Sequence, residues 1–374
     1  MLQTLNPERD AVKQSIRSLA FTPDVERATE AIYERLKGKI SPIEWQLQAP
    51  LIAEINRLKR EMNAVVLAHN YMTPDIFHGV GDYVGDSLGL AREAAKSKAS
   101  IIIQGGVHFM AETSKILAPE KTILIPDTRA GCSLASSLTG EQLRQIKARY
   151  PGLPVVSYVN TTADVKAETD ICCTSANAVQ VVEHIAREWG VDRVIMCPDE
   201  FLARNVARQT HIGIIAYKGA CEVHERFTAD DIADVRKAHP DAVVLGHPEC
   251  PPEVIAACDF TGSTTAMADY VTDNKPKQVV LITECSMADN ITADAGPDVE
   301  FLRPCNLCPH MKRITLEGIY NSLVTGTYEV TVETDIIDKA RASVQRMIDM
   351  PPLKVPARYD MIKARHHVDV ELIS

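Results

Sequence analysis

Several features that would assign this chain to a common class are missing from its sequence. No basic tract occurs, and 50 acidic against 40 basic residues give a formal net charge of -10. Nucleic-acid binding needs clustered positive charge, so no such partner is expected. No apolar run reaches the roughly 18 residues of a membrane-spanning helix, and the first residues carry charges where a secretory signal has its apolar core. We therefore expect a cytoplasmic protein that binds neither nucleic acid nor a membrane.

A low-complexity linker is also absent, and 374 residues suffice for two or three domains. Residues 1–50 are polar with a helical periodicity, which predicts an N-terminal helical extension. Apolar runs rich in β-branched residues then alternate with helical stretches, from AVVLAH near residue 64 to QVVLITE near residue 278. Such runs between helices are typical of parallel sheets covered by helices on both faces, so the predicted fold class is α/β.

A weak internal repeat divides the α/β region into three. The runs AVVLAHNY, PVVSYVN and AVVLGHPE begin near residues 64, 154 and 242, about 90 residues apart. We predict three related α/β/α domains with parallel sheets: residues 51–145, completed by residues 326–374, then residues 146–235, and then residues 236–325. Ligands of open α/β sheets bind beyond the carboxyl ends of the strands, so three facing units would focus these ends on one central cavity.

Polar side chains follow the first strand of every predicted unit. They are His69, Tyr71, Tyr158, Asn160, His247 and Glu249. A single histidine in such a place would by default be an ordinary strand-end residue. The recurrence at all three strand ends favours a shared site instead.

Ten cysteines are present, and in a reducing compartment they indicate metal binding, catalysis or burial rather than a disulfide framework. Cys132 and Cys221 each lie in a loop immediately after a strand, 89 positions apart. A third ligand for a metal or cluster has two candidates. Cys285 ends the run QVVLITEC much as the other two end theirs, whereas Cys308 forms a C-x-x-C pair with Cys305.

The residues alone leave zinc, iron–sulfur and dithiol chemistry open for these cysteines. Zinc is disfavoured because no second C-x-x-C occurs. Burial is the better interpretation of the cysteines without a suitable spacing partner, which are Cys172, Cys173, Cys197, Cys250 and Cys258.

Nine motifs in order give the chain a resemblance to the quinolinate synthase family between about residues 51 and 325. They are His69-Asn70-Tyr71, Gly85-Asp86-Ser87, FMAETSKIL at 109–117, AGCSLA at 130–135, SYVNTTADVKAETD at 157–170, CTSANAV at 173–179, HPEC at 247–250, TGST at 261–264 and CPHM at 308–311. The resemblance implies a pseudo-threefold arrangement of three α/β domains around a central active site. It also implies a condensation of iminoaspartate with dihydroxyacetone phosphate to quinolinate, phosphate and water in NAD biosynthesis, with a functional link to an L-aspartate oxidase or dehydrogenase.

The cofactor that the resemblance implies is one [4Fe-4S] cluster per chain, with three cysteine ligands and one open iron that acts as a Lewis acid. The family pattern carries these ligands onto Cys132, Cys221 and Cys308, the last because Cys285 lacks the Cys-Pro-x-Met context. Some members have C-x-x-C-x-x-C here, whereas this chain has Leu302 at the first position. A regulatory disulfide between Cys305 and Cys308 is a further alternative.

The same resemblance suggests roles for the polar residues. Glu249 and His247 would act as a paired base and acid near the open iron, and Tyr71 with His69 would handle the triose phosphate. Substrate contacts are expected from these groups and from Asp86, Ser87, Tyr158, Asn160, Ser175, Ser263 and Thr264. For Asp86 and Ser87, capping of the following helix is a nearly equal alternative to substrate contact. His224 could also reach the site.

Two other functions remain open from the sequence. One is a zinc- or thiol-dependent redox-sensing binding protein, in which Cys305 and Cys308 serve structure or sensing. The other is a different [4Fe-4S] hydro-lyase that acts on a small dicarboxylate.

Overall fold

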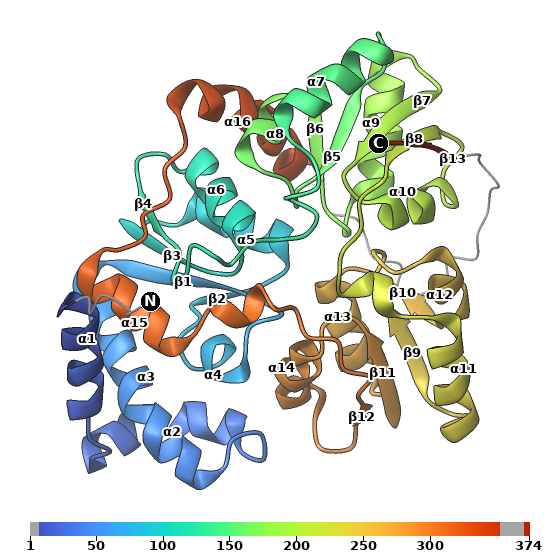
Figure 1. The fold of residues 1–374 in the computed structure, drawn as a ribbon. Helices are drawn as coiled ribbons and strands as arrows, with labels where there is room; N and C mark the ends of the chain where they lie inside the picture. The colour runs from blue at the N-terminus through green and yellow to red at the C-terminus, as the bar shows by residue number, and fades with distance from the viewer. Residues whose placement is uncertain (1–6, 352–369) are drawn as a thin grey trace, which may run out of the picture.

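A computed structural model describes residues 7–351 and 370–374 and arranges them as three α/β units with a helical segment at the N-terminus (Figure 1). Residues 1–6 of the predicted extension and residues 352–369 of the predicted C-terminal part lie outside the described residues. In the described part of the chain, no helix combines the length and the apolar character needed to cross a bilayer.

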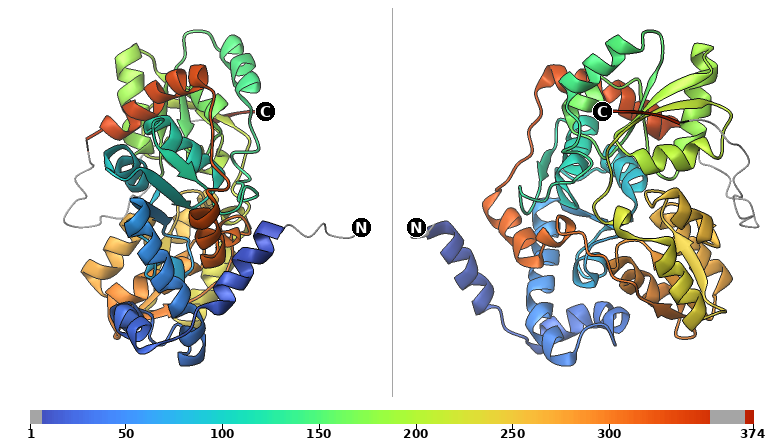
Figure 2. Two further views of the ribbon diagram at one scale, coloured as in Figure 1. Left: turned by 90° about the vertical axis from the view of Figure 1, so that its left-hand side faces the viewer. Right: turned by 45° about the vertical axis from the view of Figure 1, so that its right-hand side comes forward.

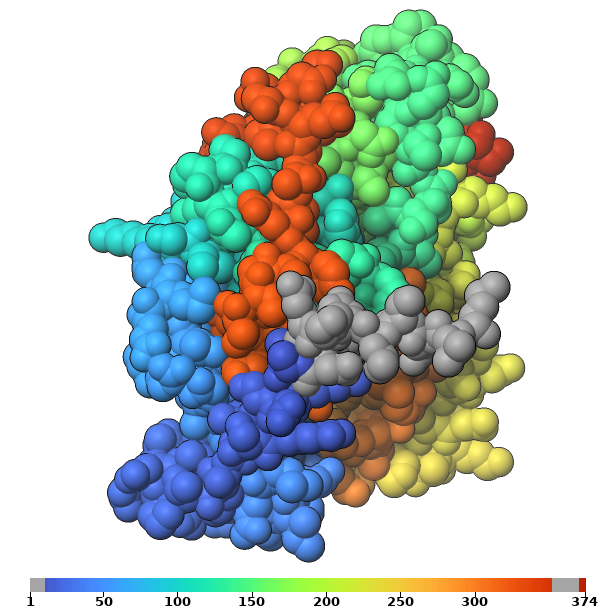
Figure 3. Space-filling model, turned by 60° about the vertical axis from the view of Figure 1, so that its left-hand side comes forward, coloured from blue at the N-terminus to red at the C-terminus, as the bar shows by residue number. Residues whose placement is uncertain are grey.

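The N-terminal segment consists of α1 (Pro7–Ser18), α2 (Pro23–Leu36) and α3 (Pro42–Met62). The starts of α2 and α3 follow from local sequence, because Thr22 and Ser41 cap them and a proline follows each cap. α3 ends at Asn63 in the left-handed region, with φ 51°. α1 lies at the periphery (Figure 2), where it packs beside the orange segment of α15 (Leu316–Thr325; Figure 3).

Each unit contains a four-strand parallel core with the same connectivity. The first unit comprises β1 (Ala64–His69), α4 (Pro74–Phe77), β2 (Tyr83–Gly85), α5 (Ser87–Lys96), β3 (Ile101–Gly105), α6 (His108–Leu117) and β4 (Thr122–Leu124). The second comprises α7 (Gly140–Arg149), β5 (Val155–Tyr158), α8 (Ala163–Ala167), β6 (Ile171–Cys173), α9 (Ala178–Trp189), β7 (Arg193–Cys197), α10 (Glu200–Ala207) and β8 (Gly213–Tyr217). The third comprises α11 (Ala229–Ala238), β9 (Val243–Gly246), α12 (Pro252–Ala257), β10 (Phe260–Thr261), α13 (Thr264–Asn274), β11 (Gln278–Ile282), α14 (Ser286–Ala295) and β12 (Glu300–Leu302).

The strand orders are β2-β1-β3-β4, β13-β8-β7-β5-β6 and β10-β9-β11-β12, where β13 is the C-terminal strand Val370–Ile373. In every unit the second strand therefore lies at one edge, followed by the first, the third and the fourth. All these pairs are parallel, as the long apolar runs predict. The α/β class and the threefold repeat are thus confirmed in space.

This topology shows that Cys285 does not occupy the position in the repeat that Cys132 and Cys221 share, contrary to what the comparison of their sequences suggested. Cys132 and Cys221 follow the fourth strands β4 and β8, whereas Cys285 follows the third strand β11. The fourth strand of the last unit is β12, and the loop after it carries Cys305 and Cys308. β12 was missed because it is only three residues long and is half exposed, so it forms no apolar run.

Residues 326–374 were predicted to complete the first unit, and within them Glu329 forms an antiparallel bridge with Leu124 of β4, while Val330 N–H donates to the carbonyl of Ile123 at 2.8 Å. β13 (Val370–Ile373) pairs with β8 and extends the second sheet, with Ile373 opposite Tyr217. α16 (Thr334–Asp349) packs on α8 and β6 of the second unit and on α6 of the first, and so joins the two units. The exact domain boundaries remain a prediction.

Candidate active site

A cavity of about 710 Å³, its open mouth included, is lined by residues from all three units. The structure brings every predicted site residue except Ser263 to its wall. Those residues are His69, Tyr71, Asp86, Ser87, Cys132, Tyr158, Asn160, Ser175, Cys221, His247, Glu249, Thr264 and Cys308. Ser263 instead caps α13, because its hydroxyl accepts the N–H of Ala266 and its side chain is buried.

The first strands of units one and three end in the same local arrangement. His69 Nδ1 accepts the N–H of Tyr71 at 3.1 Å, and His247 Nδ1 accepts the N–H of Glu249 at 3.4 Å. A ring nitrogen that accepts a hydrogen bond carries no proton, so both imidazoles are neutral and their Nε2 atoms carry the hydrogen. Burial also lowers the pKa of His69 to about 4 and that of His247 to about 3.

A chain of hydrogen bonds joins residues of the three units at the cavity. The hydroxyl of Tyr158 donates to Glu249 Oε1, and Glu249 Oε2 lies 2.8 Å from His224 Nδ1. The other ring nitrogen of His224 lies 2.9 Å from Thr283 Oγ1, which in turn lies 2.5 Å from the hydroxyl of Tyr71. A proton could therefore pass between the carboxylate and either tyrosine without leaving the protein.

Glu249 is the carboxylate at the centre of this chain. Burial raises its pKa, but the neighbouring His224 and the hydrogen bonds from His224 and Tyr158 outweigh burial and hold the pKa below the usual range. Burial, with the nearby charge of Glu249, raises the pKa of Tyr71 and of Tyr158 well above the ordinary value. The carboxylate is thus ionised and both phenols are protonated at neutral pH.

His224 was not among the expected catalytic residues, and Thr283 was missed entirely. His224 begins a 3-10 helix directly after Cys221 and is buried, with 1% of its surface exposed. The signal that could have identified it is its position three residues after a candidate ligand. Thr283 follows β11 and gives no signal in the sequence, because one threonine at a strand end is unremarkable.

The second strands lead into helices whose first turns line the cavity. Ser87 opens α5, Ser175 precedes α9, and Thr264 opens α13. Asp86 accepts the N–H of Gly89 at 2.9 Å, so the capping interpretation is confirmed for Asp86, which also faces the cavity. Helix N-termini carry unpaired N–H groups and a positive partial charge, so three of them suit carboxylate or phosphate groups.

Two polar atoms on the cavity wall have no partner among the described residues. They are Asn160 Oδ1 and His310 Nδ1, and both are buried. Buried polar groups in folded proteins are nearly always hydrogen-bonded. Their lack of a partner at the wall of a cavity is typical of groups that contact a ligand.

The loops after the fourth strands bring three free thiols to the same cavity, those of Cys132, Cys221 and Cys308. Burial raises the pKa of Cys132 to about 12 and that of Cys221 well above its usual value. Without a cation these thiols stay protonated, and thiolates here need a metal to offset their charge. Three thiols from three loops around one cavity fit a [4Fe-4S] cluster with an open iron.

The tightest group of possible metal ligands in the described residues is a different one. Ligand atoms of Cys221, His224 and Glu249 all lie within 4.8 Å of one another. This set could hold a single divalent ion, and it shares Cys221 with the set of three thiols.

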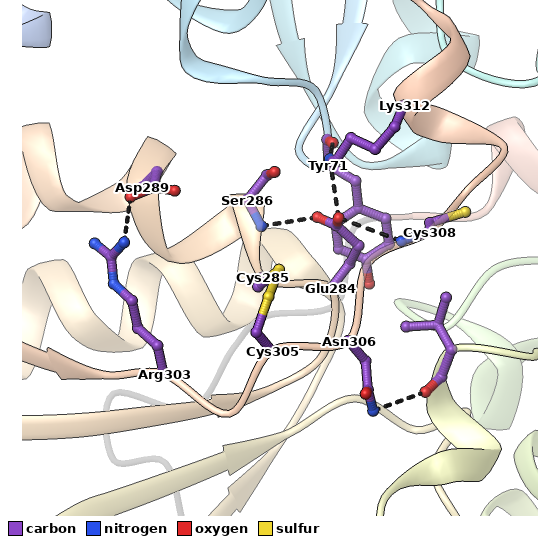
Figure 4. The surroundings of a disulfide bond; sticks show 11 residues. Tyr71, Glu284, Cys285, Ser286, Asp289, Arg303, Cys305, Asn306, Cys308 and Lys312 are labelled. Carbon is purple, nitrogen blue, oxygen red and sulfur yellow. Dashed lines mark hydrogen bonds and ion pairs between the residues drawn. A yellow bond between two sulfur atoms is a disulfide. The ribbon is translucent and has the colours of Figure 1, made fainter. Parts of the chain in front are cut away.

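Cys285 and Cys305 form a disulfide near Glu284 and Cys308 (Figure 4). Cys308 remains a free thiol, so the suggested bond between Cys305 and Cys308 does not form. The cysteines expected to be buried are so, except that Cys258 is half-buried. Cys285 is therefore unavailable as a third ligand in this structure.

Comparisons with known proteins agree with the geometry. Residues 53–349 match the family described as NadA, quinolinate synthetase A protein. A quinolinate synthase of Caulobacter vibrioides is 70% identical over 353 residues, which are 94% of this chain and 96% of the relative. Relatives with the same name are 60% identical in Sinorhizobium medicae, over 89% of this chain and 91% of the relative, and 59% identical in Xylella fastidiosa, over 79% and 86%.

Proposed function

The chain belongs to the quinolinate synthetase A family, and we propose from this premise that its central cavity condenses iminoaspartate with dihydroxyacetone phosphate. The protein is an enzyme that forms quinolinate in NAD biosynthesis. The observation that carries the proposal is the convergence of the three strand-end loops, with their thiols, imidazoles and carboxylate, on one cavity.

We infer that the resident cofactor is a [4Fe-4S] cluster held by Cys132, Cys221 and Cys308. The support is the equivalent position of the three cysteines after the fourth strands and their shared cavity. When bound, such a cluster would supply an open iron, a Lewis acid that polarises a substrate oxygen.

Substrate binding would rest on neutral donors, since the chain is acidic overall. The carboxylates of iminoaspartate and the phosphate of the triose would lie at the helix N-termini marked by Ser87, Ser175 and Thr264. Asn160, whose Oδ1 has no partner among the residues described, would bind a hydrogen-bond donor such as an imine or hydroxyl group. Ser263 would act only by capping α13.

Proton transfer would centre on Glu249. Its carboxylate is ionised and so has a free oxygen lone pair for a substrate proton, and its hydrogen bonds to Tyr158 and His224 would share that proton with the hydrogen-bonded chain. His247 and His69 are neutral, so their Nε2 hydrogens would stabilise oxyanions rather than deliver protons as imidazolium ions. Tyr71, at the other end of the chain, would protonate or deprotonate the triose.

We also propose a cytoplasmic enzyme that receives iminoaspartate from an L-aspartate oxidase or dehydrogenase. Thiolate ligands and an exposed iron need a reducing compartment, which supports this location. Iminoaspartate is a reactive imine, so an enzyme that produces it nearby would reduce the amount that is hydrolysed before it binds.

The test is a series of single Cys→Ser variants, purified without oxygen, with iron, zinc and quinolinate formation measured. We expect about four irons per chain in the parent protein, and loss of iron and activity at Cys132, Cys221 and Cys308. Cys285→Ser, which removes only the disulfide partner, should keep its iron. Iron retained in Cys308→Ser would refute the ligand assignment, and zinc without iron would favour the single-ion site of Cys221, His224 and Glu249.

A further inference from the structure

The loop that carries Cys308 has little regular structure of its own. It runs from the end of β12 to the 3-10 helix Met311–Arg313. Its anchors lie outside it: a parallel bridge joins Asn306 to Glu284, and Asn306 Nδ2 donates to the carbonyl of Val223 at 3.3 Å. The position of the Cys308 thiol therefore depends on the contacts that these neighbouring residues make with the loop.

Glu284 lies two residues after the end of β11, and its side chain is completely buried. Its Oε1 lies 2.9 Å from Lys312 Nζ and accepts the N–H of Cys308 at 3.4 Å. Its Oε2 accepts the N–H of Ser286 at 2.9 Å. Figure 4 shows this carboxylate between the Cys308 backbone and Lys312.

Lys312 extends the link to the first unit. Its ammonium also donates to the carbonyl of Tyr71 at 2.7 Å. Tyr71 follows β1, and its hydroxyl ends the hydrogen-bonded chain described above. One ion pair thus ties together the end of β11, the loop of the third thiol and the backbone of an active-site tyrosine.

The disulfide alone would not hold Cys308 in place. It anchors Cys305, three residues earlier, and three residues of chain can span about 10 Å when extended. A thiol with that freedom could leave the cavity. The Glu284–Lys312 pair acts at Cys308 itself, through its N–H.

We propose that Glu284 and Lys312 are positioning residues that set the place of Cys308 relative to Tyr71. The inference rests on the proposed role of Cys308 as a ligand, and it assigns no contact with substrate to either residue. Removing one partner leaves a buried charge without compensation, so the loop would move to solvate it. Removing both partners leaves no such charge but still frees the loop from Tyr71.

The experiment measures how fast iodoacetamide alkylates individual cysteines in the metal-free protein, with peptide mass spectrometry as the readout. We expect Cys308 to react about ten-fold faster in Lys312→Met and in the double variant Glu284→Gln/Lys312→Met, equivalent to about 1.4 kcal/mol for opening the loop. Lys312→Arg keeps the charge and should restore the parent rate. Cys132 and Cys221 should react at unchanged rates in all of these proteins.

The matched control lies on the same loop. Arg303 forms a half-exposed ion pair with Asp289 at 2.6 Å, and Arg303→Met removes a charge without touching Glu284 (Figure 4). Its Cys308 should be alkylated at the same rate as in the parent protein.

In the iron-loaded enzyme, the double variant should lose kcat at least ten-fold with KM within about two-fold, because the reacting geometry changes and the anion sites do not.

Three results would overturn the proposal: a parent rate for Cys308 in the double variant, an equal increase at Cys132 and Cys221, or an equal increase in Arg303→Met. If Lys312→Met alone unfolds, alkylation of the fully buried Cys173 reports it, and the double variant decides. Labelling of Cys308 does not depend on iron. Iron retained in Cys308→Ser would therefore refute the role of Cys308 as a ligand. The alkylation rates would still show whether Glu284 and Lys312 set the position of Cys308.

Discussion

Acidification should destabilise the metal-free protein through His69. The pKa of this imidazole is lowered from 6.5 to about 4 by burial, so between these values the unfolded chain binds a proton that the folded chain does not. Stability must then fall as the pH falls. For one site, the linkage relation gives a loss of about 3 kcal/mol between pH 7 and pH 4.

The assay is urea unfolding of the metal-free protein at several pH values between 7 and 4, compared with His69→Asn. The variant cannot gain this proton, so its stability should fall by about 3 kcal/mol less over the same range. His184→Gln serves as the control for the loss of one imidazole, because His184 is half exposed on α9 and lies outside the buried site. Equal pH dependence in the parent and in His69→Asn would refute the assignment of a neutral buried imidazole.

Two further outcomes follow from buried charges. Glu249→Gln keeps the shape of the side chain but removes the base, so kcat should fall at least about 100-fold with the fold intact; parent turnover would exclude Glu249 as the base. Lys59 is buried and lies 2.9 Å from Asp82, and it also donates to the carbonyl of Val80 at 2.5 Å. Lys59→Met should therefore lower the free energy of unfolding, measured in urea, by about 2 kcal/mol. The loss should be smaller than for a fully buried ion pair, because Asp82 is partly exposed. A loss below about 0.5 kcal/mol would contradict this.

The strands that the sequence predicts correctly are those with long apolar runs, such as β1, β5 and β9. Their residues are buried on both faces, so burial is written into consecutive positions of the chain. The edge strands β2 and β12 are three residues long and partly exposed, so neither forms an apolar run long enough to be recognised. Because β12 was not predicted, the third unit was one strand short. Cys285 was then compared with Cys132 and Cys221 in place of the cysteines that follow β12.

The polar residues at strand ends could be predicted because parallel strands of one sheet place their carboxyl ends on the same edge. Their partners could not. The hydrogen-bonded chain depends on Thr283 and His224, which lie 59 positions apart, and no local pattern relates them. Asp86 and Ser263 both cap helices, a role that their local sequence context allows. Only the packing of the units decides that Asp86 also faces the cavity.

By itself, the sequence determined the α/β class, the threefold repeat and the residue types of the site, because these follow from hydrophobic periodicity and from motifs within single loops. Only the tertiary structure decided that β13 joins the second sheet, that Cys285 pairs with Cys305, and that Glu284 meets Lys312. Each of these contacts joins residues from different elements. Their free energy depends on how whole units pack, and that packing sums many weak interactions that no short stretch of sequence contains.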